Sequence, residues 1–542
     1  MSHDSNSVEI DLDRRTFLKL TAATGTALLL GSHKVFSSPK GTSLPYFAVH
    51  PFIESHPTAV FIARTAVDVK TNGDAIYSAA RDIGRSIFVG SETPGIPLTH
   101  NIAVKPNLTA RAGGHPLYTV ERSMGIITDA RFVEGLIDSM KELGIAGNKF
   151  YIREVDPPAY YDDGSYAAMA ARTGADIRDL SANVTALNPQ DVQWVEIPDG
   201  TWHRRLPYLW PVNAPDSWLL NVAKLKAHAM GLTLSAKNLQ GTIAHEYQAH
   251  CTPFGQEMNI SSVDVQPNAW ATIQANYDRH VAANIPRWDR PGSDGGIWQE
   301  TWTTRCLDNN SVTHPGLHII EGIYGRDGHF MDGPSPEGIA TDYMTNVVVF
   351  GKNPFLIDIV GHWLGGHEPG NFGLFHMAVE RGQCPALNPM NIPVYEWKTD
   401  GTAVVTSLSN FTRTPLRTLY LRRDYNGQAE DVWHLVNEPY IYGTDSVNDT
   451  KSRRPEAVVL HQNYPNPFNP STSIAYSIPR NGQVRLEIFN ALGERVDVPV
   501  DAFRSAGSHL AVWNSHQSPS GIYFYRLMFE GFSSTKSMVL VK

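Results

Sequence analysis

Cysteine is scarce in this sequence. Three cysteines occur in 542 residues, Cys251, Cys306 and Cys384; they lie far apart and their number is odd. Neither a disulfide framework nor a CxxC metal site can be drawn from them, although one disulfide remains open. No internal iron–sulfur cluster is expected, because such a cluster takes four cysteine thiolates.

A strong charge of either sign is also lacking. The formal net charge of -9 is mild for this length, and no basic stripe is present that would follow a phosphate backbone. We therefore expect no nucleic-acid partner. The chain is too long for one ordinary core, and its length suggests roughly two to four domains.

Common catalytic signatures are missing as well. The sequence contains no GxSxG, Walker loop, GxGxxG or HExxH. The usual hydrolase, nucleotide-binding and zinc-protease mechanisms therefore lack support.

The N-terminal region contains a pair of arginines. They begin the run RRTFLK at residues 14–19, and a short apolar stretch follows that ends near Gly31. This order resembles a twin-arginine export signal over residues 1–38, which implies the twin-arginine translocase as a partner. The alternative is an amphipathic N-terminal helix. Because the apolar stretch is too short to remain as a span, we expect no transmembrane span in the mature protein.

Residues 458–542 differ in character from the rest of the chain. Apolar and polar residues alternate, turns recur roughly every 8 to 12 residues, and helical patterning disappears, which predicts a small β-sandwich. VRLEIFNALGERV is a predicted strand pair around an Asn-Ala-Leu-Gly turn, and GIYFYRLMFEGFSSTKSMVLVK is a second pair around Glu530-Gly531.

The same C-terminal segment has a recognisable sequence. QNYPNPFNPSTSIAYSIP, NALGERV, SGIYFYRL and the terminal MVLVK resemble the type A C-terminal sorting domain of the type IX secretion system. The resemblance implies export through the periplasm to the cell surface or extracellular space of a Gram-negative-type bacterium, with the type IX machinery as a partner. An adhesion or stalk module is the alternative. The charged, proline-bearing KSRRPEA lies in the predicted linker, residues 443–457.

Between residues 44 and 442, short β-branched runs alternate with longer helical runs. This pattern predicts an α/β domain with a mostly parallel sheet flanked by helices. The predicted strands are residues 101–107, 149–156, 217–228, 317–325 and 346–351, and the predicted helices are 132–144, 165–175, 232–241 and 353–366. Residues 286–306, rich in Trp, Gly and Arg, are predicted to be a long loop that either covers a ligand or only covers apolar surface.

This domain contains four segments that resemble one family. VKPN at 104–107, NVAKLKAHAMGLTLSAKNLQG at 221–241, EGIYGRDGHFMDGP at 321–334 and VVVFGKNPFLIDIVGHWLGGHEP at 347–369 are similar to domain of unknown function 362. The family commonly has an aspartate where this chain has Glu321, which preserves the charge. No general activity is established for this family, so the resemblance does not imply a particular reaction. Some members also carry ferredoxin-like cysteines, which this chain lacks.

Distinctive polar residues follow the ends of the predicted strands. In an open α/β sheet, ligands bind at the carboxyl ends of the strands. The polar residues at these ends are Lys105 and Asn107, Glu154 and Asp156, then Lys224, Lys226 and His228, and finally Glu321, Arg326 and Asp327. Strand alternation places Lys224, Lys226 and His228 on one face, and Lys237 and Asn238 at a helix start are predicted to turn back toward the same crevice.

These groups favour an anion. Lysines and asparagine amides suit a carboxylate or phosphate, and a lysine in a dry pocket can act as a base or a Schiff-base nucleophile. The predicted catalytic residues are Lys226, His228 and Lys237, and the predicted ligand-binding residues are Lys105, Asn107, Glu154, Lys224, Asn238, Glu321 and Asp358. Asp358 is either an inward acid or a capping partner. The alternative is that the lysines snorkel from a sheet edge and His228 is a satisfied polar residue.

A divalent metal is a further possibility in GTIAHEYQAHC. His245 and His250 lie beside Glu246 and Cys251, and His228 would complete a three-ligand open site. The histidines are five residues apart, so a helix would not place both on one face and only a loop could bring them together.

The leading hypothesis is therefore an exported, cofactor- or metal-assisted enzyme that acts on a small anionic substrate. The alternatives are a non-catalytic surface protein that binds an anion or metal, and a structural surface protein whose polar stretches seal the sheet.

Overall fold

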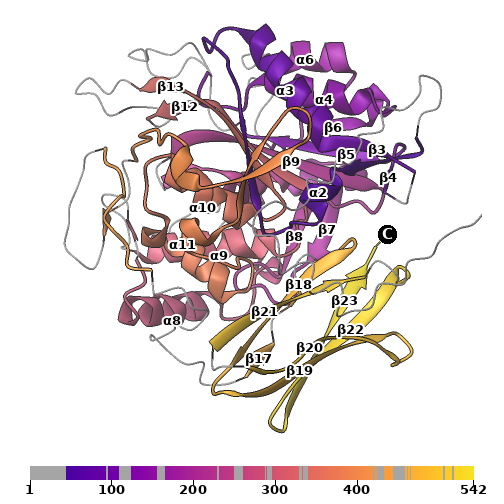
Figure 1. Cartoon of the computed structure of the whole chain (residues 1–542), viewed down its shortest axis with the longest axis vertical. Coiled ribbons are helices and arrows are strands. Elements are labelled where there is room, and N and C mark those ends of the chain that lie inside the picture. Colours follow the sequence, from indigo (N-terminus) through magenta and orange to yellow (C-terminus); the bar gives the residue numbers. More distant parts are fainter. Residues whose placement is uncertain are drawn as a thin grey trace, which may run out of the picture. The chain divides into compact units, whose positions relative to one another are not determined.

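The computed structural model of the chain is shown in Figure 1. It describes residues 44–92, 95–108, 124–155, 165–228, 231–248, 260–286, 288–289, 296–328, 333, 340–418, 422–423, 433–442, 458–460, 462–463, 466–504, 507–515 and 518–541. The predicted signal, residues 1–38, and the predicted linker, residues 443–457, lie outside these ranges.

A nine-stranded sheet forms the centre of the α/β part. Its order is β15-β14-β2-β13-β12-β9-β5-β6, with β10 paired to β9. The strands are β2 (Val60–Arg64), β5 (Asn101–Pro106), β6 (Phe150–Ile152), β9 (Ser217–His228), β10 (Gly231–Thr233), β12 (Leu317–Asp327), β13 (Thr341–Gly351), β14 (Val394–Trp397) and β15 (Ala403–Thr406). Strands β6, β5, β9 and β12 run parallel, β13 is antiparallel to β12 and β2, and β14 is parallel to β2. The predicted mostly parallel sheet is confirmed.

Strand β9 shows why the sheet is apolar on both faces. Leu220 and Val222 belong to one buried core, whereas Ala223, Leu225 and Ala227 belong to the other. Successive side chains of a strand point to opposite faces, so helices must cover both.

The first core lies under one helical layer, α3 (Gly73–Ile87), α4 (Ala130–Lys141) and α6 (Tyr166–Thr173), which group together in Figure 1. Helix α4 begins where the Asp129 side chain accepts a hydrogen bond from the Arg131 amide at 2.8 Å. Its predicted apolar face is buried, and the chain leaves the helix through Gly144, whose φ of 107° suits glycine.

The second core lies under α7 (Ser235–Asn238), α8 (Ala269–Ala282), α9 (Ile297–Asn310), α10 (Pro354–Leu364) and α11 (Gly373–Glu380). Helix α10 matches its prediction: the Asn353 side chain accepts from the amides of Phe355 and Leu356 at 3.0 and 3.1 Å.

Helix α9 corrects the loop predicted over residues 286–306 for its last part, residues 297–306. Every residue of α9 is buried, and Trp298, Trp302 and Cys306 pack into the second core. Their spacing of four residues is that of one helix face. The residues between them are polar, and a polar residue is normally expected at the surface. Because these polar residues are buried as well, the sequence of α9 does not show the usual contrast between an apolar and a polar face.

Shorter elements surround the sheet. They are α2 (Pro51–Glu54), β1 (Tyr46–Val49), β3 (Phe88–Ser91), β4 (Ile96–Pro97), β7 (Val192–Glu196), β8 (Arg205–Leu209), β11 (Trp288–Asp289) and β16 (Arg422–Arg423).

The C-terminal strands form a small β-sandwich with its own core. One sheet contains β17 (Val459–Leu460), β18 (Ser471–Ile478) and β21 (Gly507–Asn514), and the other contains β20 (Arg495–Arg504), β19 (Gly482–Asn490), β22 (Gly521–Phe529) and β23 (Phe532–Leu540). Side chains from both sheets share one core, and both predicted hairpins are confirmed. Across the ranges that the structure describes, no helix is both long and apolar enough to span a bilayer.

Candidate functional site

The carboxyl ends of β6, β5, β9 and β12 meet at one edge of the sheet, as the parallel pairing requires. Lys105 of β5 is the register partner of Asn221, and Lys224 is the partner of Glu321. Residues that are register partners on neighbouring strands point to the same face of the sheet. Asn221 and Lys224 are three residues apart on β9, so their side chains point to opposite faces. The predicted residues are therefore divided between the two faces and not gathered in one crevice.

Lys105 and Glu154 form a buried ion pair on the face covered by α7. The Lys105 Nζ lies 2.6 Å from Glu154 Oε2 and also donates to the Pro106 carbonyl at 2.6 Å. The two Glu154 oxygens accept from the amides of Val155 and Leu108 at 3.0 and 3.2 Å. Both charges are thus satisfied within the protein, and the pair joins the ends of β5 and β6.

Asn238 links α7 to this pair. Its Oδ1 accepts from Lys105 Nζ and Asn107 Nδ2, each at 3.2 Å. Its Nδ2 donates to the Lys105 carbonyl at 3.1 Å and to Asn221 Oδ1 at 2.7 Å. These four bonds use the full capacity of the amide. Four predicted ligand-binding residues, Lys105, Asn107, Glu154 and Asn238, are therefore brought together, and Asn221 is an addition that sequence reasoning missed.

Gly241 allows this close packing. A Cβ atom there would lie 2.0 Å from Glu154 Oε1 and 2.6 Å from Lys105 Cε, far inside van der Waals contact. Only glycine fits beside the ion pair. In the sequence, the only indication of this role is that Gly241 directly follows the polar segment SAKNLQ.

Asp358 caps α7 from the neighbouring helix α10. Its two carboxyl oxygens accept from the amides of Ser235 and Ala236 at 2.7 and 2.8 Å. Burial raises the pKa of Asp358 to about 8, and the two amide hydrogen bonds oppose that shift. Of the two predicted roles, the geometry matches the capping partner.

The first residue of α7 has further contacts below it. The Ser235 hydroxyl lies 2.7 Å from His318 Nδ1, and Asn221 Nδ2 donates to the Ser235 carbonyl at 3.0 Å. Burial lowers the pKa of His318 to about 3, so its ring is neutral. Asn221 Nδ2, which can only donate, also lies 3.0 Å from His318 Nδ1, so Nδ1 is the acceptor and the Ser235 hydroxyl donates to it. Neither Ser235 nor His318 was singled out from the sequence.

Lys237 lies between these fixed residues. It is 6% exposed, and no described residue forms a hydrogen bond or ion pair with its ammonium group. A charge in so sheltered a position needs water or a counter-charge, and the described residues supply no counter-charge. Lys237 is therefore the group at this edge whose charge is best suited to a ligand.

The end of β9 differs from its prediction. Residues 231–233 are not helical; they form β10 and pair back onto β9, so that Thr233 is the partner of Lys226 and Gly231 that of His228. Gly231 has a φ of 91°, and a Cβ there would lie 2.7 Å from the Phe372 ring. Lys226 and His228 are 3% and 8% exposed, which puts both in a sheltered position at the carboxyl edge.

Lys224 and Glu321 form the second buried ion pair, on the face covered by α4. Their Nζ and Oε2 atoms are 2.6 Å apart, and Nζ lies 3.4 Å from the centre of the Tyr324 ring. The Tyr324 hydroxyl donates to Asp129 Oδ2 at 3.0 Å. Burial raises the pKa of Glu321 and Lys224 opposes that shift. Both side chains are fully buried, so a ligand cannot reach this ion pair in the structure, and its role here is to hold β9 and β12 together.

The other predicted residues are separate from these clusters. Asp327 pairs with Arg417 at 2.6 Å, and Arg326 donates to the Met124 carbonyl at 3.2 Å. Asp156 lies outside the described residues.

The predicted metal ligands are only partly described. His245 lies in a short 3-10 helix, and Glu246 accepts from the Val184 amide at 2.9 Å. His250 and Cys251 lie outside the described residues. Within the described ranges, no three or more His, Cys, Asp or Glu side chains are grouped so that they could hold a metal ion.

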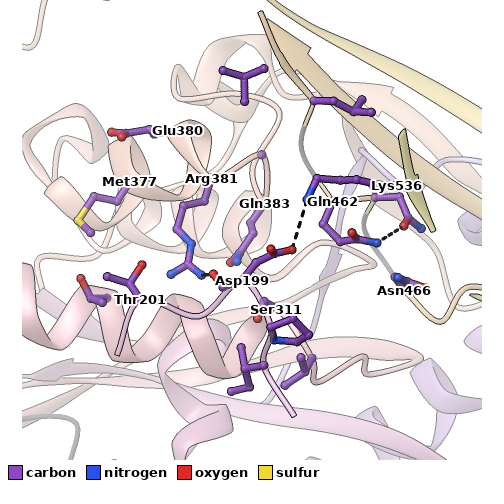
Figure 2. Close-up of a pocket in the computed structure, with 18 of the residues that line it drawn as sticks. Asp199, Thr201, Ser311, Met377, Glu380, Arg381, Gln383, Gln462, Asn466 and Lys536 are labelled. Atoms are coloured by element: carbon purple, nitrogen blue, oxygen red, sulfur yellow. Dashed lines mark hydrogen bonds and ion pairs between the residues drawn. The ribbon is translucent and has the colours of Figure 1, made fainter. Parts of the chain in front are cut away.

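A pocket of about 1330 Å³ lies apart from these residues. Figure 2 shows residues that line it. Its wall includes Thr201, Glu380, Arg381 and Gln383, and none of the described residues predicted for the site lines it. Arg381 pairs with Asp308 at 2.7 Å and Glu380 with Arg279 at 2.5 Å. Because these charges are matched, the pocket offers no excess positive charge for an anion.

Comparison with known protein families gives two matches. Residues 102–362 match a domain of unknown function, DUF362, and residues 462–542 match a secretion system C-terminal sorting domain. The first match covers the carboxyl ends of all four parallel strands, the whole of α7, and α10 as far as His362. No curated protein matches the chain. The sorting domain indicates export to the cell surface or extracellular space with the type IX secretion machinery.

Proposed function

We propose that this exported protein is an enzyme acting on a small anionic substrate, and that a carboxylate or phosphate of the substrate binds Lys237 at the carboxyl edge of the sheet. The observation behind this proposal is that Lys237 is 6% exposed and that no described residue neutralises it. The polar side chains on either side of it, Ser235 and Asn238, are bonded to their neighbours. An anion would supply the missing partner, with charge-assisted hydrogen bonds.

Lys226 and His228 are the proposed proton-transfer groups. Alternation along β9 places them on the face opposite Ala227 and α7, so they are proposed to reach the substrate around the carboxyl end of the strand. Both are sheltered at the end of β9, and an imidazole or a buried ammonium can exchange a proton near neutral pH. A divalent metal held by His228, His245 and His250 stays a secondary part of the proposal, because His250 lies outside the described residues. A non-catalytic anion-binding surface protein is the alternative, since Lys237 alone would suffice for binding.

Binding is tested by calorimetric titration of the protein with inorganic phosphate, acetate and citrate. Lys237→Met keeps the length of the side chain and removes its charge, so we expect the affinity for the bound anion to fall about 10- to 100-fold, the size of one lost charge-assisted hydrogen bond. The melting temperature should change little, because the ammonium group has no hydrogen bond or ion pair with a described residue to lose. Lys398→Met, at an exposed lysine paired with Glu396, is the control and should bind as the parent does.

Two results would contradict the proposal. One is unchanged anion binding by Lys237→Met, and the other is unfolding of that variant, which would make Lys237 structural. His228→Gln distinguishes the two hypotheses. If the protein is an enzyme, this variant should lose turnover and keep its affinity for the anion. If the protein only binds the anion, neither the parent nor the variant should show turnover.

We also propose that residues 1–38 are a twin-arginine signal, so that the chain crosses the inner membrane folded before the sorting domain directs the second step. The run RRTFLK followed by a short apolar stretch supports this route.

A further inference from the structure

Helix α7 needs support from outside itself. It has four residues, and its own N-cap position, Leu234, supplies no side-chain hydrogen bond. Helices of this length do not persist alone, because nucleation costs more than one turn returns. Yet α7 contains both Lys237 and Asn238.

We propose that Asp358 is a positioning residue that fixes α7, and with it Lys237, in the geometry that binds the anion. The carboxyl oxygens of Asp358 accept from the first two amides of α7 at 2.7 and 2.8 Å, which is the role that a residue at the N-cap normally performs. Asp358 is 2% exposed and lies inside α10, so its position is set by a helix that belongs to the second core. As far as the anion is concerned, this inference rests on the proposed function.

Contacts at both ends of α7 restrict its movement to one pose. At the first residue, Ser235 is bonded to His318 and Asn221; at the last, Asn238 is bonded to Asn221 and Lys105. Among the residues that the structure describes, Asp358 alone accepts hydrogen bonds from the amides of Ser235 and Ala236. In Asp358→Asn only one acceptor oxygen remains and an NH2 group takes the place of the other, so one of the two buried amides is left unsatisfied and the end of the helix nearest α10 is loosened.

Asn353 provides a matched control on the same helix. Its side chain also accepts from two backbone amides, those of Phe355 and Leu356, but these belong to α10 itself. Asp358→Asn and Asn353→Ala thus both disturb a pair of capping bonds, and only the first concerns α7.

The experiment combines hydrogen exchange with phosphate binding on the full chain. In Asp358→Asn, we expect the peptide covering residues 234–239 to exchange at least 10-fold faster and the affinity for inorganic phosphate to fall at least 10-fold. In Asn353→Ala, both quantities should stay within 2-fold of the parent even if its melting temperature falls by a similar amount. Equal exchange in Asp358→Asn and the parent, or equal changes in the two variants, would overturn the proposal.

The two proposals fail in different ways. If the parent protein binds no phosphate, acetate or citrate, the proposed function is lost, and the exchange of residues 234–239 still decides the role of Asp358. If the parent binds and Lys237→Met does not, but Asp358→Asn binds as the parent, only the positioning role is lost.

Discussion

At the scale of single residues, three lysines that look alike in sequence have different surroundings. Lys105 pairs with Glu154, 49 residues away, and Lys224 pairs with Glu321, 97 residues away, whereas Lys237 has no described partner. Alternation along β9 predicts which face each residue points to. It does not predict which carboxylate stands opposite, because that depends on the register of strands distant in sequence.

Lys224→Met should destabilise the protein strongly. It leaves Glu321, which is fully buried, without its counter-charge, and breaking a buried ion pair in this way costs about 3–5 kcal/mol. Urea unfolding measures the loss. Because an uncharged glutamine needs no counter-charge, Lys224→Met/Glu321→Gln should recover part of it. If the free energy of unfolding of Lys224→Met lay within about 1 kcal/mol of the parent value, which is the effect of an ordinary substitution, the ion pair would be dispensable for stability.

Asp358 should make stability depend on pH. Its folded pKa of about 8 lies above the unfolded value near 3.9, so the folded state retains a proton that the unfolded state has lost. Its contribution to stability is therefore complete below about pH 4 and declines as pH rises toward 8. Burial lowers the pKa of His362 to about 4, so between about pH 4 and 6.5 only the unfolded state binds this proton, and the contribution of His362 to stability rises over that range. The raised pKa of Cys384, about 12, lies outside the window. His362 is present in the parent and in Asp358→Asn, so comparing the two proteins isolates the effect of Asp358.

The measurement is the melting temperature of the parent and of Asp358→Asn between pH 4.5 and 8.5. The parent should lose stability relative to the variant as pH rises. Parallel curves would mean that Asp358 has an ordinary pKa in the folded protein.

At the scale of elements, the sequence predicted helices and strands correctly where apolar residues recur with a regular period. It did not predict segments that are very short or whose polar residues are buried. β9 spans the predicted residues 217–228, and α10 begins at the predicted Asn-Pro. α9 was missed because its polar residues are buried, and β10 because three residues give no period to read. The same limit applies to the site: Lys105, Asn107, Glu154 and Asn238 follow recognisable strands and a helix start, whereas His318 lies near the beginning of β12 and has no such signal.

The 3-10 turn η4 (Leu239–Thr242) should not accept a side chain at Gly241. In Gly241→Ala the new methyl group would meet Glu154 Oε1 at 2.0 Å, so either the turn or the ion pair must shift. Overpacking of this kind costs about 1–3 kcal/mol. Thermal unfolding should show the loss, and phosphate affinity should fall as well because η4 follows α7 directly. A stable variant with unchanged binding would mean that the turn moves freely.

At the scale of the whole molecule, sequence told most at the C-terminus. The sandwich was predicted from alternation and turns, and its resemblance to a sorting domain is confirmed by the family match over residues 462–542. The α/β fold class is confirmed too, since parallel pairing follows from alternating strands and helices. Neither match names a reaction: one is a domain of unknown function and the other a sorting domain. The fold alone does not determine the chemistry.

The proposed twin-arginine route makes export depend on the arginine pair near the N-terminus. Arg14→Lys/Arg15→Lys should leave most of the protein in the cytoplasm, because the twin-arginine route depends on the arginine pair. Arg453→Lys/Arg454→Lys, a second adjacent pair in the linker region, is the control and should be exported normally. Immunoblots of cytoplasmic, periplasmic and external fractions report the outcome; normal export of the first variant would show that another signal is used.

The place of β2 in the sheet sets the boundaries of any fragment that can be produced alone. β2 pairs with β13 through residues 60–64, and Phe61 stacks on Phe350 with ring centres 5.5 Å apart. A fragment limited to the family match, residues 102–362, would lack β2 and α3, leaving the outer edge of β13 and its apolar face open. Unpaired apolar edges recruit other chains. Such a fragment should aggregate, as light scattering would show, whereas one that begins at residue 44 keeps that edge covered.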